Sequence, residues 1–175
     1  MKTLNSLLLA FFSFILIVSC GGKEEKKKEG FSYEKVIKEE KVDTSKNTNE
    51  DVANVVLTAD DLMKFNKDEI RVKAGQKVKL TLRHIGKLDI NVMGHNVTIL
   101  KKGVDLVEFA TKAAAERDNG YLPKDSEDDI IVHTKLIGGG ETTVIEFDAP
   151  EVGTYEFLCT FPAHFAMMRG KFIVE

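Results

Sequence analysis

The C-terminal stretch TYEFLCTFPAHFAMMRGKFIVE, residues 154–175, contains two strand patterns joined by a loop. Thr154 to Cys159 and Lys171 to Val174 carry the β-branched and aromatic residues that favour strands. Pro162 bends the chain between them, and Gly170 precedes the final strand. The pattern predicts a strand, a loop that turns back, and a last strand that closes the chain.

The same strand-and-turn pattern begins at about residue 51. From there on, short stretches of alternating apolar residues are separated by turn residues. Ala74-Gly75-Gln76 is one such turn, and Gly138-Gly139-Gly140 is expected to form a hairpin loop. Frequent short strands of this kind are typical of a β-sandwich. The upstream strands that we expect are Val55–Leu57, Ile70–Val72, Val78–Leu82, Asn96–Leu100, Ile130–Leu136 and Thr143–Phe147. With the last two, they predict an all-β fold of about eight strands.

One insertion departs from the strand pattern. Asp105 to Glu108 has the residue types of a helix-capping box, and the alanine-rich segment after it favours a helix as far as Arg117. Asn119-Gly120 then ends the helix. We therefore expect one short helical insertion in the sandwich.

The N-terminus has the features of an export signal. Lys2 precedes an apolar run, Leu7 to Val18, which is too short for a comfortable membrane span. Ile17-Val18-Ser19-Cys20 resembles a bacterial lipobox, in which cleavage precedes a cysteine that carries lipid. An uncleaved anchor helix and an ordinary signal peptide with an incidental cysteine are the alternatives. In each case we expect the folded part in the cell envelope, on the periplasmic or outer-membrane face.

Residues 20–50 are rich in Lys, Glu, Asn, Thr and Ser and poor in apolar residues. Such a segment cannot bury enough surface to offset the entropy of ordering, so we expect a flexible tether. The predicted organisation is a signal peptide over 1–19, a lipidated Cys20 with its tether over 20–50, and one folded domain over 51–175.

The formal net charge is −3, from 25 basic and 28 acidic residues, and the sequence lacks the concentrated basic face that nucleic-acid binding needs.

Composition makes one cysteine conspicuous. Cys20 and Cys159 are the two cysteines of the chain. With lipid on Cys20, an exported domain keeps a single thiol, which is a liability unless it is buried, catalytic or bound to metal.

The loop after Cys159 supplies two further metal donors, the imidazole of His164 and the thioether of Met168. Thiolate, imidazole and thioether together suit Cu(I) and tolerate Cu(II). One more histidine would complete the His₂Cys site with a weak axial methionine that characterises blue-copper electron-transfer centres. His95 is the candidate, because the preceding glycine leaves room for close approach to a metal.

Three segments of the sequence, and the position of one further histidine, resemble the corresponding parts of azurins. Azurins are blue-copper proteins of the cupredoxin family. The matching parts of this sequence are Asn91-Val92-Met93-Gly94-His95-Asn96, His133-Thr134-Lys135-Leu136-Ile137-Gly138, Cys159-Thr160-Phe161-Pro162, and His84. The resemblance covers roughly residues 51–175. It implies a Greek-key, cupredoxin-like sandwich that holds one type 1 copper ion and transfers electrons.

The resemblance also implies roles for single residues. The implied copper ligands, three equatorial and one axial, are His95, Cys159, His164 and Met168. The Gly94 carbonyl would be a distant contact opposite the axial ligand. Asn96 and the Phe161 amide would surround the cysteine sulfur, where hydrogen bonds raise the reduction potential. His84 would be a second histidine that does not bind the metal.

Each ligand also has a simpler interpretation. Cys159 alone would be a small buried hydrophobic residue, and Met168 would be core filler. His164 alone would be a loop histidine, and His95 alone a solvated residue at a strand end. Met167 offers an alternative register for the axial donor. His133 is expected to be a surface residue. The chain also lacks the N-terminal disulfide that azurins usually have, since its domain holds one cysteine.

Apolar residues flank the expected ligands and predict an exposed patch around His164. They are Met93, Pro162, Ala163, Phe165, Ala166 and Met167. Phe165 is expected to enlarge this patch. Small apolar patches suit brief redox docking, where interfaces bury less than about 1,200 Å². We expect a monomer that docks transiently with redox proteins such as cytochromes or reductases.

Four protein ligands leave no open position for a substrate, which favours outer-sphere electron transfer over catalysis. The expected function is therefore the shuttling of single electrons. The alternative is a membrane-anchored copper-binding or copper-delivery protein without a carrier role. Multicopper oxidase and nitrite reductase domains would need additional histidine pairs, and a binuclear copper centre would need a second cysteine near Cys159. A zinc site is disfavoured because a thioether is a poor zinc ligand.

Overall fold

The structure, a computed structural model, describes residues 52–175. The expected signal peptide over 1–19, Cys20 and the tether over 20–50 lie outside the described residues. Within the described part, no helix has the length and apolar character needed to cross a membrane. In chain order the elements are β1 (Val52–Asp60), β2 (Lys64–Phe65), β3 (Glu69–Val72), β4 (Lys77–His84), α1 (Ile90–Met93), β5 (Thr98–Leu100), α2 (Leu106–Ala113), η1 (Arg117–Asn119), β6 (Ile130–His133), β7 (Thr142–Asp148), β8 (Gly153–Leu158), η2 (His164–Ala166) and β9 (Arg169–Val174).

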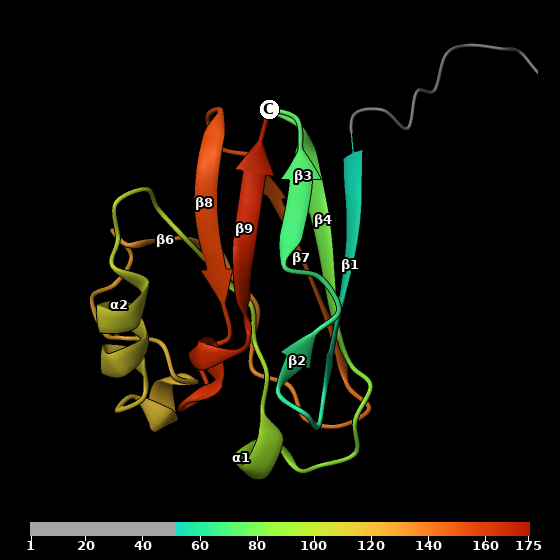
Figure 1. Cartoon of the computed structure of the whole chain (residues 1–175), viewed down its shortest axis with the longest axis vertical. Helices are drawn as coiled ribbons and strands as arrows, with labels where there is room; N and C mark the ends of the chain where they lie inside the picture. The colour runs from blue at the N-terminus through green and yellow to red at the C-terminus, as the bar shows by residue number, and fades with distance from the viewer. Residues whose placement is uncertain (1–51) are drawn as a thin grey trace, which may run out of the picture. The chain divides into compact units, whose positions relative to one another are not determined.

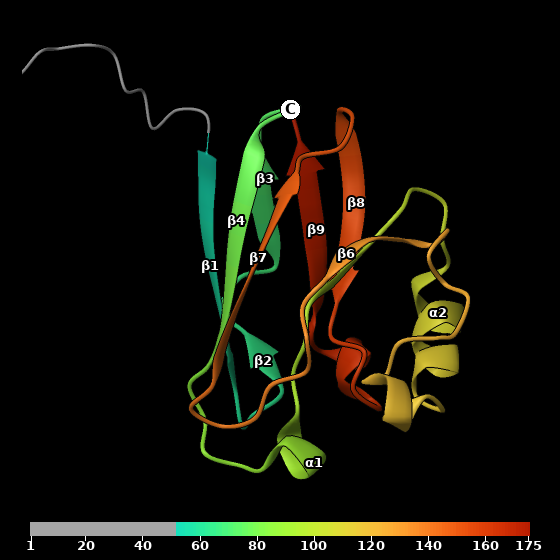
Figure 2. The same cartoon turned by 180° about the vertical axis from the view of Figure 1, so that it is seen from behind.

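The strands form two sheets that pack as a sandwich (Figures 1 and 2). One sheet has the strand order β2-β1-β4-β7 and the other β3-β9-β8-β5-β6. The pairs β1–β4 and β3–β9 are parallel, whereas the other pairs are antiparallel. Helix α2 lies outside the sandwich beside β6 and β8, and α1 lies at the end where β8 runs into η2. The expected Greek-key β-sandwich with a helical insertion is confirmed.

Alternating side chains build the core. In β4, every second residue points inward, and Val78, Leu80 and Leu82 are fully buried. Phe157 of β8 and Phe172 of β9 fill the space from the other sheet and are also fully buried. Each such side chain contributes about 1.5–3 kcal/mol through burial, so the core holds both sheets, and the loops at their ends, in fixed positions.

All eight expected strands are present, and the structure adds strand β2, helix α1 and the 3-10 turn η2, which the sequence did not predict. Strand β2 and helix α1 are too short to show a hydrophobic period. Helix α2 begins as expected, because the Asp105 side chain accepts hydrogen bonds from the amides of Val107 and Glu108. It ends at Ala113 rather than continuing to Arg117, and a short 3-10 turn, η1, follows.

The expected hairpin loop at Gly138-Gly139-Gly140 is wrong. Strands β6 and β7 belong to different sheets, so this segment crosses from one layer of the sandwich to the other. A Cβ at Gly139 would lie 2.4 Å from the carbonyl carbon of Lys87. The glycine therefore allows a close approach of two backbone segments, beside the loop that leads into α1.

Candidate metal centre

Three donor side chains from separate segments meet inside one end of the sandwich. His95 follows α1, Cys159 follows β8 directly, and His164 begins η2. All three side chains are buried, with 0%, 0% and 3% of their surface exposed. Their ligand atoms all lie within 4.8 Å of one another. The sequence expectation that these residues come together is therefore met.

The spacings between these atoms fit one ion. The Cys159 sulfur lies 3.6 Å from Nδ1 of His164 and 3.9 Å from Nδ1 of His95. It also lies 3.9 Å from the Gly94 carbonyl oxygen. Bonds from Zn²⁺ to nitrogen and sulfur donors in proteins are about 2.0–2.3 Å long. A transition-metal ion of similar size, placed among the three donors, can therefore reach all of them.

Of the two adjacent methionines, Met168 is the buried one. It is fully buried, whereas 60% of Met167 is exposed. The Met168 carbonyl accepts a hydrogen bond of 2.9 Å from the Cys159 amide, and its own amide donates to the His164 carbonyl at 2.7 Å. The backbone of Met168 is thus tied to both loop donors, which favours Met168 over Met167 as the thioether donor.

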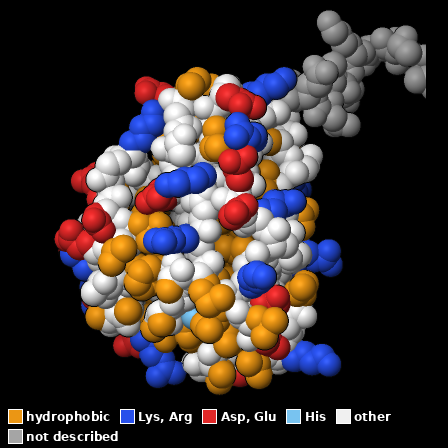
Figure 3. Space-filling model, in the orientation of Figure 1, with side chains coloured by type: hydrophobic (Ala, Val, Ile, Leu, Met, Phe, Trp, Pro, Cys, Tyr) orange, Lys and Arg blue, Asp and Glu red, His pale blue; other side chains and the backbone are white. Residues whose placement is uncertain are grey.

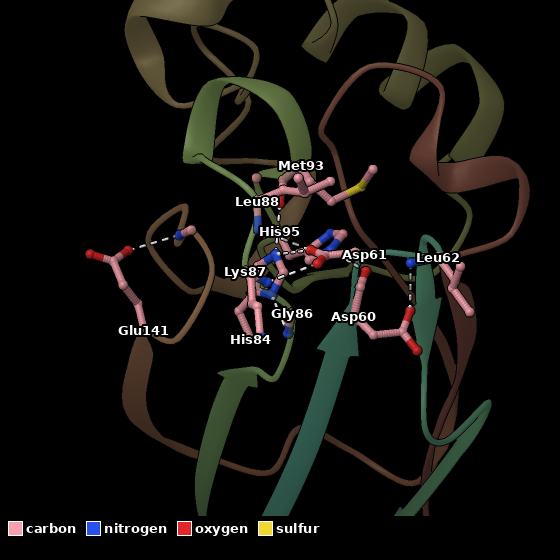
Figure 4. A network of polar contacts seen from close by, with 12 residues as sticks. Asp60, Asp61, Leu62, His84, Gly86, Lys87, Leu88, Met93, His95 and Glu141 are labelled. Atoms are coloured by element: carbon pink, nitrogen blue, oxygen red, sulfur yellow. Dashed lines mark hydrogen bonds and ion pairs between the residues drawn. The ribbon is translucent and has the colours of Figure 1, made fainter. Parts of the chain in front are cut away.

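Hydrogen bonds set the orientation of the His95 ring (Figure 4). Its Nε2 donates to the carbonyl of Asp60, the last residue of β1, at 2.9 Å. In the neutral ring this leaves Nδ1 without a proton and with its lone pair toward the cysteine sulfur. A metal-ligating histidine is commonly fixed in this way by a carbonyl on its other nitrogen.

His84 lies beside the donors but is fully engaged elsewhere. Its Nε2 donates to the Met93 carbonyl at 2.8 Å, and its Nδ1 accepts from the Gly86 amide at 3.0 Å (Figure 4). The side chain is buried, and its ring centroid is 4.5 Å from that of His95. Both ring nitrogens are used within the protein, so His84 is a packed neighbour of the site. His133 is exposed, as expected.

The cysteine sulfur receives backbone hydrogen bonds from Asn96 and Phe161. The Asn96 side chain also locks the loop, because its Oδ1 accepts from the Thr160 amide at 2.8 Å and its Nδ2 donates to the Thr160 hydroxyl at 2.7 Å. The sequence had indicated Asn96 and the Phe161 amide near this sulfur. The reciprocal bonds to Thr160 are an additional feature that joins the two halves of the site.

Burial keeps the metal-free donors uncharged. It raises the pKa of the Cys159 thiol to about 12, against the opposing effect of the Asn96 and Phe161 amides. It lowers the pKa of His95 to about 4, partly offset by the hydrogen bond to Asp60, and that of His164 to about 4. At neutral pH the metal-free site therefore holds one thiol and two neutral imidazoles. A bound cation favours the thiolate and so reverses the effect of burial on Cys159.

Gly94 has a packing role in addition to the one expected. A Cβ there would lie 2.5 Å from the Ile90 carbonyl oxygen and 3.0 Å from the Phe161 ring. The space that a side chain would need is filled by α1 and by the ligand loop. Glycine at this position thus lets the segment before His95 pack closely against the segment after Cys159.

The surface above the donors is partly apolar. Ala163, Ala166 and Met167 are exposed, whereas Met93 and Pro162 are half-buried. Phe165 is also half-buried: one side packs against the core cluster around Leu158, and the rest of the side chain stays exposed. Exposed apolar residues that the sequence reasoning missed lie on loops and on α1 at the same end: Leu62, Ile85, Leu88 and Val92. Figure 3 shows hydrophobic side chains gathered on the lower part of this face, with a histidine among them.

The signal for these missed residues was weak. Leu62, which Met63 follows, and Leu88 lie in short segments next to strand ends, where hydrophobic periodicity gives no assignment. Only their position on the folded loops shows that they share one end with Met167.

Comparisons with known proteins agree with this geometry. The sequence profile of the family described as copper binding proteins, plastocyanin/azurin family, matches residues 51–175. Azurin-1 of Alcaligenes xylosoxydans xylosoxydans is 40% identical over 121 residues, which cover 67% of this chain and 93% of that protein. Azurin of Pseudomonas chlororaphis is 40% identical over 127 residues, covering 69% of this chain and 97% of that protein.

Solved structures show the same fold. Auracyanin A of Chloroflexus aurantiacus, a blue copper protein, has a TM-score of 0.64 at 30% identity and covers 71% of this chain and 99% of its own. Dithionite-reduced auracyanin of Roseiflexus castenholzii has a TM-score of 0.63 at 32% identity, with coverages of 70% and 97%. The single copper ion expected from the sequence agrees with this family and with the buried donors. The chain therefore belongs to the plastocyanin/azurin family of copper-binding proteins.

Proposed function

We propose that this protein is a small electron carrier that exchanges single electrons with other redox proteins. The observation that carries the proposal is the closed donor cluster of His95, Cys159 and His164. In the proposed site these residues and Met168 would hold one copper ion, with the Gly94 carbonyl as a further contact. Copper supplies a one-electron change between its two common oxidation states.

The surrounding residues would keep the site ready for this change. The Asp60 carbonyl fixes the His95 ring, and the bonds between Asn96 and Thr160 fix the ligand loop. Donors held in place by the core cannot rearrange much between oxidation states, so the reorganisation that slows electron transfer stays small. Burial also excludes water, and four protein donors leave no position for a substrate. We therefore propose a carrier and not an enzyme.

The electron would leave through His164. Its imidazole lies just beneath the surface, with 3% exposed, and the neighbouring Ala163, Ala166 and Met167 are exposed. A monomer with this apolar patch can dock briefly with partners such as cytochromes or reductases. The flanking Met93, Pro162 and Phe165 complete the proposed docking surface.

The same proposal includes an envelope location. The resemblance of Ile17-Val18-Ser19-Cys20 to a lipobox supports cleavage before Cys20 and lipid attachment to it, with residues 20–50 as the tether and 51–175 as the carrier domain.

Optical and EPR spectra of the purified protein with copper added test this function. We expect an intense visible absorption and an EPR signal typical of type 1 copper, because the Cys159 thiolate binds the oxidised ion. Cys159→Ser should abolish the intense colour, while Met167→Leu, the control at an exposed position, should keep it. A Cys159→Ser protein that stayed intensely blue would overturn the ligand assignment. Rapid loss of Cu(I) to a weak chelator would favour copper delivery instead.

A further inference from the structure

Five exposed cations surround the metal end of the domain. Lys64, Lys67 and Arg169 line one shallow cleft together with the exposed Met167 side chain. Lys87 lies on the loop that leads into α1 (Figure 4), and Arg117 donates a hydrogen bond of 2.9 Å to Asn91 of α1. We call these five residues the cation rim. Among the described residues, no carboxylate lies within ion-pair distance of any of them.

The cleft also contains one exposed carboxylate, Asp68, whereas two other carboxylates at the same end are turned toward the backbone. Asp61 accepts hydrogen bonds from the amides of Lys87 and Leu88, and Asp89 accepts from the Asn91 amide. These bonds lower the pKa of both carboxyls and hold them against the loops. The long lysine and arginine side chains, in contrast, carry their charges outward into solvent. The cleft beside Met167 thus presents three cations and one carboxylate to an approaching molecule.

The sides of the sandwich are arranged differently. There, lysines on the sheets pair with carboxylates on neighbouring strands, as in Lys77–Asp148 at 3.0 Å and Lys79–Glu146 at 3.4 Å. Figure 3 shows alternating basic and acidic side chains on the upper part of the face, above the hydrophobic region. The whole chain has a formal net charge of −3. The cleft beside Met167, with three cations and one carboxylate, therefore has a local charge opposite to that of the molecule.

We propose that the redox partner carries a ring of carboxylates around its own electron-transfer centre and docks these against the cation rim. This inference rests on the proposed carrier function and names the chemistry of its partner. The apolar patch at Met167 would form the dry centre of the contact, and the rim would steer and orient the encounter. An anionic lipid surface would also attract the rim, but it would cover the patch beside His164 and block the path of the electron.

A redox-inert anion locates the positive surface without relying on electron transfer. Hexacyanochromate(III) is paramagnetic and broadens the NMR signals of nearby amides. Added to the copper(I) protein and to the metal-free protein, it should broaden the amides of Lys64, Lys67 and Arg169 first. Signals of Lys73 and Lys77, at the far end of the sandwich, should stay sharp. Broadening that is uniform, or that centres on the far end, would overturn the proposal.

Matched variants test the effect on the rate. The rim variant combines Lys64→Gln, Lys67→Gln and Arg169→Gln, and the control combines Lys73→Gln, Lys77→Gln and Lys79→Gln. Both lose three positive charges, but the control positions lie in the turn before β4 and in its first residues, remote from the site. Lys77 is about 23 Å along the strand from His84. Stopped-flow oxidation of the copper(I) protein by hexacyanoferrate(III) transfers one electron from copper to iron without breaking a bond.

We expect the native rate with hexacyanoferrate(III) to fall as salt rises from about 0.01 to 0.3 M, because screening weakens a local attraction. The rim variant should be about three- to ten-fold slower at low salt, and the control nearly unchanged. With the cationic oxidant tris(phenanthroline)cobalt(III), the rim variant should be faster than the native protein.

The outcomes separate this inference from the proposed function. A blue, redox-active protein whose rates depend only on net charge, so that both variants behave alike, would refute the rim and leave the carrier intact. A protein that reacts with neither oxidant would refute the carrier function itself. If the rim variant kept native rates but lost binding to phosphatidylglycerol vesicles, the rim would serve a lipid surface and the proposed partner would be wrong.

Discussion

At the scale of single residues, the adjacent methionines differ sharply in burial, and this predicts different effects on the copper centre. Met168→Leu conserves volume and should cost less than about 1.5 kcal/mol in stability. Loss of the proposed thioether donor would disfavour the oxidised ion, so we expect a higher reduction potential with the colour retained. Cyclic voltammetry measures this change. Met167→Leu, at a position that is 60% exposed, should leave the potential unchanged; a shift of equal size in both variants would contradict the assignment.

The two buried imidazoles predict a pH-dependent stability of the metal-free protein. The pKa values of His95 and His164 are about 4 in the folded protein and about 6.5 in an unfolded chain. Between these values the unfolded chain binds more protons, so the free energy of unfolding decreases as pH falls from about 6.5 to about 4. Each histidine contributes at most about 3 kcal/mol to this loss.

Urea unfolding of the metal-free protein between pH 7 and pH 5 measures this slope before most carboxylates titrate. His164→Gln should flatten it, whereas His133→Gln, at an exposed position, should not. A native protein whose stability is constant over this range would refute the prediction.

Local sequence was most informative about the proposed site where the donors are close in the chain. Cys159, His164 and Met168 lie in one loop, and their spacing alone suggested a shared metal. His95 lies far upstream, and its place depends on the pairing of β5 with β8, in which Thr98 faces Leu158. No local pattern encodes that pairing, so resemblance to azurins had to supply it.

At the scale of elements, the segment before β5 and the loop after β8 are joined by the Asn96 side chain. Asn96→Ala would remove both hydrogen bonds to Thr160 and leave a buried amide unsatisfied, at a cost of about 1–3 kcal/mol. We also expect a broadened or shifted visible band, because the cysteine loop loses its brace. Urea unfolding and absorption spectroscopy test both effects. Asn54→Ala, on the exposed side of β1, is the control, and equal behaviour of the two variants would contradict the prediction.

Long amphipathic strands could be predicted, whereas short or layer-crossing elements could not. Strand β4 shows strict alternation, and a two-residue period has one structural meaning. Helix α1 has four residues and therefore no measurable period. The glycines at 138–140 indicated a turn correctly, but whether a turn stays within one sheet depends on which strands pair, and that is decided by the tertiary structure.

At the scale of the whole molecule, the organisation of residues 1–50 stays a prediction. Cys20→Ser should release the protein from membranes in soluble form, because the proposed lipid has no other attachment point. Fractionation of cells followed by detection of the protein measures this, with Cys159→Ser as the control that removes the other thiol and keeps the anchor. Membrane retention of the Cys20→Ser protein would point to an uncleaved helix instead.

The contact between the Asp60 carbonyl and His95 also has a mechanical consequence. Strand β1 is where the chain enters the described domain, and it runs in parallel register with β4 from Val52 to Ala59. A pull on the leading end would load this ladder in shear along its whole length. A slip by one residue would displace Asp60 by about 3.3 Å, and the imidazole would lose the acceptor that fixes its tautomer. A shift of β1 would therefore change the hydrogen bonding of His95, a proposed copper ligand. We expect tension strong enough to cause this shift to change the colour of the copper-bound protein.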